Sequence, residues 1–302
     1  MKLLKAIITV IRFPNLVFIF LTQLLAYHFL IGKYLQQHHL PSLLQGIHFY
    51  LFAFSTVLIA AAGYIINDYF DIGIDAVNKP SRVTIEKIFK RRTIIIWHIA
   101  LNTLALIMVS YIALQFLQLR YVLCQLFSIF LLTIYSTTFK RKLIIGNISI
   151  AILTAMTLFS LALYEAHFPI TDFKSKSIIL FYLYLIFAFL ITFAREVIKD
   201  IEDIKGDGLQ NCKTIPLVWG IQSAKNFVYM VLAILLVLFV LLMTMIIESN
   251  FILLFYWIAF IILPIAYLFY QIHLANTAAH FHRISTMLKL ITLAGILSMI
   301  LT

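Results

Sequence analysis

The stretch 47–75 reads IHFYLFAFSTVLIAAAGYIINDYFDIGID and combines two patterns that decide the fold. Residues 47–66 are almost entirely apolar, and about 20 such residues are enough for a helix to cross the hydrocarbon core of a bilayer. A cluster of oxygen-bearing side chains follows directly, formed by Asn67, Asp68, Asp71 and Asp75. The stretch therefore predicts a membrane-spanning helix that ends in a group of carboxylates.

The stretch 178–207 repeats this arrangement later in the chain. An apolar run at 178–198 leads into a second acidic cluster, formed by Glu196, Asp200, Asp203 and Asp207. Nine of the 12 acidic residues fall in these two regions: Asp68, Asp71, Asp75, Glu86, Glu196, Asp200, Glu202, Asp203 and Asp207. Like charges repel strongly where water is scarce, so such clusters persist where divalent cations or basic partners offset them. The two acidic clusters are therefore the predicted functional site.

The composition places the whole chain in a membrane. Of the 302 residues 63% are hydrophobic and 12% are charged, with a mean hydropathy of +1.03, which leaves too little polar surface for a soluble globule. We predict an all-α fold, a polytopic membrane helical bundle of about nine helices around a central cavity, in a single domain covering 1–302. The predicted spans are 13–32, 47–66, 94–115, 120–138, 146–164, 178–198, 226–247, 251–271 and 285–302.

The distribution of basic residues predicts the orientation. Connections on the side of the N-terminus hold 19 of the 23 Lys and Arg residues, and the other side holds Lys33, Arg120, Lys174 and Lys176. Because cytoplasmic loops carry the excess of positive charge, we expect a multi-pass protein of the cell (inner) membrane with its N-terminus and both acidic clusters on the cytoplasmic side. The net charge of +11 then reflects topology and attraction to anionic lipid headgroups, not nucleic-acid binding.

The spacing within each cluster suits metal binding. At about 100° per residue, Glu196, Asp200, Asp203 and Asp207 fall within roughly 60° of one another on one helix, and the first cluster spans roughly 100°. Carboxylate and amide oxygens suit Mg²⁺, which keeps open positions for phosphate oxygens. Two such clusters facing each other predict a Mg²⁺-bridged clamp for a diphosphate.

Basic residues near the clusters suit the same ligand. Lys79 and Arg82 follow the first cluster, Lys140 and Arg141 follow the fourth span, and Lys199 lies within the second cluster. Cations beside metal ligands fit a phosphate-containing leaving group. Each acidic cluster alone is also compatible with a solvated helix end paired with neighbouring Lys and Arg, but two matched clusters on the same side favour the metal site.

These motifs resemble those of the UbiA-type intramembrane prenyltransferases. The pattern from Asn67 to Asp75 matches the first signature of that family without a gap, and the segment from Asp203 to Asp207, followed by Lys213-Thr214-Ile215-Pro216 and Gly220, is similar to the second. The resemblance extends over nearly the whole chain. It includes Tyr135 with Lys140-Arg141, and Gly146-Asn147 at the start of the fifth span.

The resemblance implies a function for the predicted site. It implies Mg²⁺ held by Asn67, Asp68, Asp71, Asp75, Glu196, Asp200, Asp203 and Asp207, with Asp71, Asp75, Asp203 and Asp207 as the catalytic carboxylates. The diphosphate of an isoprenyl donor would contact Lys79, Arg82, Tyr135, Lys140, Arg141 and Lys199. An acceptor from the membrane would attack the allylic carbon, in a lipid-facing chamber that keeps water away.

The acceptor is the least determined part of this prediction. Glu196 and the sequence around it look most similar to the branch that prenylates geranylgeranylglyceryl phosphate in ether-lipid synthesis. Aromatic acceptors of quinone biosynthesis, such as hydroxybenzoate, dihydroxynaphthoate or homogentisate, are the alternative. The sequence indicates no obligatory protein partner.

A transporter with acidic cation sites is an alternative from a different class. Transporters usually bury ionisable groups near the middle of the membrane, as coupling sites. Here the predicted spans are nearly free of charge, and the carboxylates lie at their ends. This distribution favours an enzyme.

Overall fold

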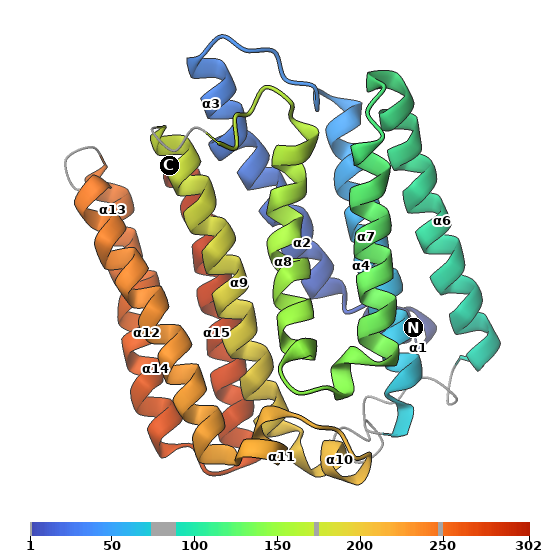
Figure 1. Ribbon diagram of the computed structural model, residues 1–302, viewed down its shortest axis with the longest axis vertical. Coiled ribbons are helices and arrows are strands. Elements are labelled where there is room, and N and C mark those ends of the chain that lie inside the picture. Colours follow the sequence, from blue (N-terminus) through green and yellow to red (C-terminus); the bar gives the residue numbers. More distant parts are fainter. Residues whose placement is uncertain (1, 74–88, 172–174, 247–249) are drawn as a thin grey trace.

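The computed structural model describes residues 2–73, 89–171, 175–246 and 250–302, nearly all of them in helices. Within these residues, nine helical stretches are long and apolar enough to cross a membrane, which confirms the predicted fold class. They run side by side along the long axis of the molecule (Figure 1). They are Phe13–Gln37, Ile47–Phe70, Arg91–Phe116, Arg120–Thr137, Ile145–Tyr164, Lys176–Glu202, Ile221–Thr244, Phe251–Leu274 and Ala278–Leu301.

Six helices form a closed ring. Each packs against the next in the order α2, α4, α7, α8, α9 and α15, and α15 returns to α2. Their bounds are Phe13–Leu25, Ile47–Phe70, Arg120–Thr137, Ile145–Tyr164, Lys176–Glu202 and Ala278–Ser298. Helices α6 (Arg91–Phe116), α12 (Ile221–Ile246), α13 (Phe251–Trp257) and α14 (Leu263–Leu274) pack on the outside of this ring. The ring creates the space in which a site can form.

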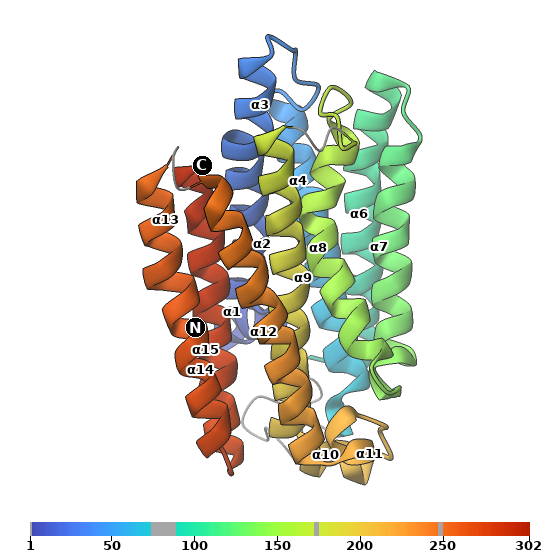
Figure 2. The same cartoon turned by 60° about the vertical axis from the view of Figure 1, so that its left-hand side comes forward.

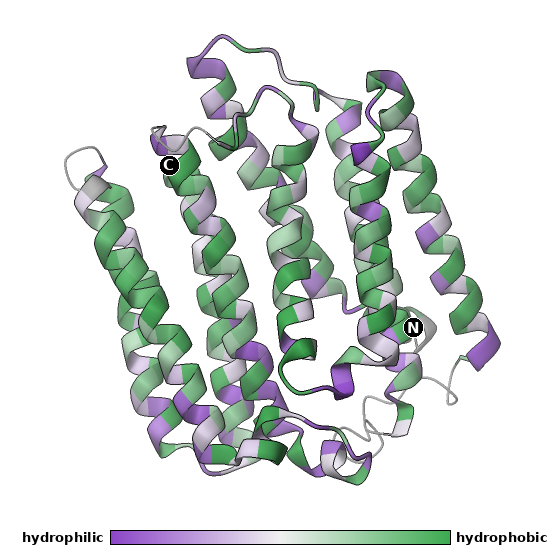
Figure 3. Ribbon diagram, in the orientation of Figure 1, coloured by the Kyte–Doolittle hydropathy of each residue, from purple (hydrophilic) through white to green (hydrophobic). Residues whose placement is uncertain are grey.

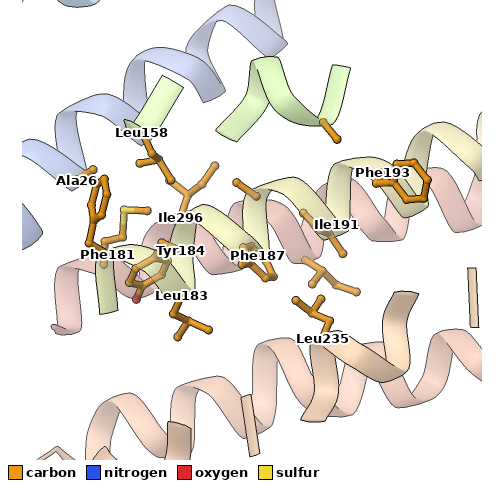
Figure 4. Close-up of a cluster of buried hydrophobic side chains, with 14 of the residues drawn as sticks. Ala26, Leu158, Phe181, Leu183, Tyr184, Phe187, Ile191, Phe193, Leu235 and Ile296 are labelled. Atoms are coloured by element: carbon orange, nitrogen blue, oxygen red, sulfur yellow. The ribbon is translucent and has the colours of Figure 1, made fainter. Parts of the chain in front are cut away.

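Helix α9 organises the buried core. It packs against α8, α12 and α15, and it supplies Phe181, Leu183, Tyr184, Phe187 and Ile191 to the cluster in Figure 4. A Cβ atom at Gly295 of α15 would collide with the ring of Phe187. Glycine at this position therefore allows α15 to approach α9 closely beside a large aromatic side chain.

Two membrane-spanning stretches contain π-helical turns. The turn η1 (Ala26–Ile31) connects α2 to α3 (Gly32–Gln37), and the turn η3 (Ile258–Ile262) precedes Pro264 at the start of α14. Proline removes a backbone donor and bends a helix, which explains the second turn. The first turn contacts α8, α9 and η4 (Met299–Leu301), so it closes the ring at one end.

The last helix begins earlier than predicted. The sequence predicted a span at 285–302, whereas α15 starts at Ala278. Its first turns carry His280, His282 and Arg283, so they lack the hydropathy of a span but are helical. The Thr277 hydroxyl caps the helix by accepting a hydrogen bond from the backbone N–H of His280 at 3.3 Å.

Polar residues gather at the ends of the helices. In Figure 3 the middle of the bundle is hydrophobic, and the lower end is rich in hydrophilic residues. The short helices α10 (Ile204–Leu209) and α11 (Ile215–Trp219) lie at this lower end in both Figures 1 and 2. The N-terminus lies in the lower half and the C-terminus at the upper end (Figure 1), as expected for an odd number of spans.

Candidate active site

A cavity of about 770 Å³ lies inside the ring. Its lining residues come from all six ring helices and from the segments next to them at the lower end. Both acidic clusters contribute to it: Asn67, Asp68, Asp71, Glu196, Asp200, Asp203 and Asp207. These seven side chains from the two clusters therefore line one cavity.

The first cluster lies at the end of α4. Asn67 and Asp68 belong to the last turn of the helix, and Asp71 follows it. Asp71 is buried, and its Oδ2 atom accepts hydrogen bonds from the Asn67 amide at 2.6 Å and from the Lys140 ammonium. Asp68 pairs with Arg12 at 2.7 Å. The remaining member of the predicted cluster, Asp75, lies outside the described residues.

Two of these partners are placed by their local backbone. Arg12 adopts a left-handed conformation (φ 50°) between α1 (Lys2–Val10) and α2, which directs it toward Asp68. Lys140 lies in the turn η2 (Phe139–Arg141). A Cβ atom at Gly146 would lie 2.9 Å from the carbonyl oxygen of Phe139, so glycine is needed for α8 to start this close to the turn.

The second cluster differs from the single helical stripe predicted from the sequence. Helix α9 ends at Glu202, and α10 begins at Ile204, so Asp203 lies at a break and Asp207 belongs to the next helix. The chain bends there, yet all four carboxylates still line the cavity. The spacing of the four carboxylates could not reveal the break, because residues three or four positions apart also lie on one face of an uninterrupted helix.

The members of the second cluster already have polar partners. Both oxygens of Glu196 accept hydrogen bonds from Lys199, at 3.0 and 2.9 Å. Asp200 accepts a hydrogen bond from the amide of Asn147 at 2.8 Å. Glu196 thus acts as an anchor for cations, whereas Asp200 is held by a neutral donor.

The predicted phosphate-binding residues separate into three groups. Tyr135, Lys140 and Lys199 line the cavity. Arg141 is exposed and is not among the lining residues, and its carbonyl accepts a hydrogen bond from the backbone N–H of Lys213 at 2.9 Å. Lys79 and Arg82 lie outside the described residues.

Sequence reasoning did not single out Arg12, Arg195 and Lys289 as site residues, although all three line the cavity. Burial disfavours the charged form of Arg12, but Asp68 outweighs this effect, so the pKa of the guanidinium is raised above its usual value. Pro14 could have indicated that Arg12 lies at the start of a helix, because proline is common in the first turn of helices. Arg195 and Lys289 stood out only as charges within apolar runs.

The residues present fit a magnesium ion by their chemistry. Asn67 Oδ1 is buried beside Asp68 and Asp71 and has no hydrogen-bond partner, which makes it an available amide oxygen. Asp, Glu and Asn oxygens are the donors that Mg²⁺ prefers. In the described part of the chain, no three His, Cys, Asp or Glu side chains are already placed so that they could hold a metal ion together. Asp68, Asp71 and Glu196 are instead paired with basic residues.

A scan against protein-family models matches residues 25–291 to the UbiA prenyltransferase family. The chain belongs to the UbiA prenyltransferase family. This confirms the resemblance inferred from the two acidic motifs.

Two curated relatives of the chain carry the same name. A digeranylgeranylglyceryl phosphate synthase from Thermococcus sibiricus is 30% identical over 197 residues, which cover 65% of this chain and 64% of that protein. A second protein of this name, from Methanothrix thermoacetophila, is 36% identical over 188 residues, or 62% of this chain and 64% of that protein. The chain thus matches just under two thirds of the length of each relative.

Solved structures share the fold over the full length. A structure of digeranylgeranylglyceryl phosphate synthase is 21% identical, with a TM-score of 0.67 over 99% of this chain and 98% of that one. A UbiA homologue from Archaeoglobus fulgidus, bound to DMAPP and Mg²⁺, is 15% identical, with a TM-score of 0.62 over 98% of this chain and 99% of that one. At these identities the similarity establishes the fold.

Proposed function

We propose that the chain transfers an isoprenyl group from an isoprenyl diphosphate to a membrane-associated acceptor in a Mg²⁺-dependent reaction. The best-supported acceptor is geranylgeranylglyceryl phosphate. The observation that carries the proposal is the shared cavity, into which α4, α9 and α10 bring seven carboxylate or amide side chains from two distant parts of the sequence.

The charged end of the cavity suits the diphosphate. Lys140 and Lys199 would bind its oxygens through charge-assisted hydrogen bonds. Asn67, Asp68, Asp71, Asp200, Asp203 and Asp207 are the described residues that would hold Mg²⁺, and Asp75 is proposed to join them. When bound, Mg²⁺ supplies positive charge that stabilises the departing diphosphate.

The apolar part of the cavity suits the isoprenyl chain. Leu158, Phe187 and Ile296 line it above the charged end and appear in the cluster of Figure 4. As the bond between the allylic carbon and the diphosphate breaks, its electron pair leaves with the diphosphate, and the acceptor oxygen forms the new bond and releases its proton. An apolar wall keeps water from competing with the acceptor.

The relatives support the ether-lipid acceptor. Both curated relatives described above are named for the synthesis of digeranylgeranylglyceryl phosphate. The name describes the product expected when a geranylgeranyl group joins geranylgeranylglyceryl phosphate. The Glu196 motif points to the same branch.

Purified protein in detergent tests this function. We expect Mg²⁺-dependent release of diphosphate from geranylgeranyl diphosphate, with faster turnover on geranylgeranylglyceryl phosphate than on hydroxybenzoate, dihydroxynaphthoate or homogentisate. Faster turnover on an aromatic acceptor would redirect the proposal to quinone biosynthesis. Cation flux in liposomes without diphosphate release would replace the enzyme with a transporter.

We further propose that the charged end of the cavity faces the cytoplasm, because most Lys and Arg residues lie at that end. Arg92→Cys and Gln45→Cys place exposed thiols at the two ends of the helices, in a background with Cys124 and Cys212 replaced by Ser. A membrane-impermeant maleimide should label Gln45→Cys in intact cells and Arg92→Cys only after lysis. The opposite labelling would invert the orientation.

A further inference from the structure

A cationic wall lines the cavity where α2, α9 and α15 pack together. Arg12, Arg195, Lys199 and Lys289 all line the cavity there. In the described part of the chain, the carboxylates paired with this wall are Asp68, which binds Arg12, and Glu196, which binds Arg195 and Lys199. The four positive charges of the wall are thus paired with only two carboxylates.

Lys289 carries much of this excess. Its ammonium donates a hydrogen bond to the Asn15 side-chain oxygen at 2.7 Å and lies 5.0 Å from the centre of the Phe18 ring. Both partners are neutral, and Lys289 forms no ion pair within the described residues. It lies in the membrane-spanning stretch Ala278–Leu301, where an ionisable group is costly and usually marks a functional site.

Arg195 is also incompletely satisfied. One terminal nitrogen lies 3.3 Å from a Glu196 oxygen that Lys199 also binds, and its Nε atom is buried without a hydrogen-bond partner. Arg195 of α9 and Lys289 of α15 line the same cavity on two helices that pack against each other, so their positive charges repel. Arg195 shares its one carboxylate with Lys199, and Lys289 has only neutral partners, so a further anion would offset their charges.

We propose that Arg195 and Lys289 form a second anion site, in which Asn15 positions the Lys289 ammonium, and that this site binds the phosphate monoester of the acceptor. The inference rests on the proposed function and separates the acceptor phosphate from the donor diphosphate. Arg195 precedes Asp203 by eight residues, or about 12 Å along the axis of α9. The second site therefore lies deeper in the cavity than Asp203.

The charges at the site favour a phosphate over a carboxylate. A phosphate monoester carries about two negative charges near neutral pH, which matches the excess of two positive charges on the wall. The carboxylate of an aromatic acid would offset only one of them. In a glyceryl phosphate, the reacting hydroxyl lies two carbon atoms from the phosphate oxygen, so binding the phosphate here holds the hydroxyl inside the chamber.

Direct binding of the acceptor tests the inference without relying on turnover. Labelled geranylgeranylglyceryl phosphate is added to purified protein in detergent, without donor and in the presence of EDTA, which removes divalent ions. We expect binding to persist in EDTA and to weaken at least about tenfold in Lys289→Met, because a charge-assisted hydrogen bond is lost. Lys289→Arg should retain most of the affinity.

Two controls isolate the phosphate. Arg92→Met removes an exposed cation at the start of α6, away from the cavity, and should bind the acceptor as the wild type does. The glyceryl ether without its phosphate should bind weakly and equally to the wild type and to Lys289→Met. Together these results would assign the loss to the contact between Lys289 and the phosphate.

Three results would overturn the second site. They are unchanged phosphate-acceptor binding in Lys289→Met, an equal loss for the acceptor with and without phosphate, and stronger displacement of the label by hydroxybenzoate than by unlabelled phosphate acceptor. Failure of the proposed function has a different signature, namely no Mg²⁺-dependent release of diphosphate by the wild type with any acceptor.

Discussion

Buried carboxylates occur at both ends of this molecule, but their partners differ. At the far end from the acidic clusters, Glu165 is fully buried and accepts hydrogen bonds from the Ser42 hydroxyl at 2.7 Å and from the backbone N–H groups of Leu43 and Leu44. At the charged end, Asp68, Asp71 and Glu196 face flexible Arg and Lys side chains around a cavity.

This difference separates a structural carboxylate from a functional one. Backbone N–H groups are fixed in position by the chain, so their hydrogen bonds to Glu165 hold the segment before α4 against the end of α8. The ammonium and guanidinium groups at the charged end can turn toward a substrate phosphate and leave the carboxylates for a metal ion. Fixed backbone donors therefore indicate a role in folding, and long charged side chains around a cavity indicate a binding site.

The largest effect is expected from removing a carboxylate at the charged end. Asp71→Ala and Asp203→Ala should each lower turnover by at least about 10³-fold, because a metal ligand and the charge stabilisation it provides are lost. Thermal unfolding in detergent should change little, since both side chains face a polar cavity. Wild-type turnover in either variant would show that the carboxylates at the charged end are not functional in the way proposed.

Removing Mg²⁺ should lower turnover by a similarly large factor, because it acts at the charged end, and should leave the fold around Glu165 unchanged. EDTA is expected to abolish diphosphate release, and added Mg²⁺ should restore it, because the diphosphate needs divalent cations to offset its charge beside the acidic clusters. The unfolding temperature without substrate should hardly move. Full activity in EDTA would show that Lys140, Lys199 and the other cations suffice without a metal.

The opposite pattern is expected at Glu165. Glu165→Gln keeps the shape but places an amide beside donors that need an acceptor, which should lower the free energy of unfolding by about 1–3 kcal/mol. Ser42→Ala, which removes one of the three donors, should cost less. Turnover per folded molecule should stay near the wild-type value in both variants, and a selective loss of turnover in Glu165→Gln would contradict the structural role.

The smallest expected effect is a difference in KM between variants of two neighbouring cations, Lys140 and Arg141. Lys140 contacts Asp71 inside the cavity, whereas the exposed Arg141 does not line it. Lys140→Met should raise the KM for the isoprenyl diphosphate about tenfold, and Arg141→Met should change it by less than about threefold. Equal effects would mean that Arg141 also reaches the substrate.

Much of the fold was predictable because hydropathy reports directly on membrane spans. The nine spans follow from apolar runs, and the two acidic clusters follow from their position at the ends of such runs. The start of α15 was placed too late, at 285 instead of Ala278, because its first turns carry the polar residues His280, His282 and Arg283 and so lack the hydropathy of a span. The break at Asp203 was missed because helical spacing persists across it.

The missing parts of the site depend on contacts distant in sequence. Arg12, between α1 and α2, binds Asp68 of α4, and Asn147 of α8 binds Asp200 of α9. Lys289 and Asn15 are 274 residues apart. No local pattern indicates such pairs, and the same limit explains why Arg141 could not be distinguished from Lys140 before the turn η2 was known.

Equilibrium binding of a non-reactive isoprenyl thiodiphosphate analogue tests the central claim most directly, using the wild type, Asp71→Ala, Asp203→Ala and the double variant. If the two acidic clusters hold one ligand through shared metal ions, binding requires Mg²⁺, each single variant weakens it strongly, and the double variant weakens it by less than the product of the single effects. Binding that ignores Mg²⁺, or single effects that multiply fully in the double variant, would contradict a single site formed by both clusters.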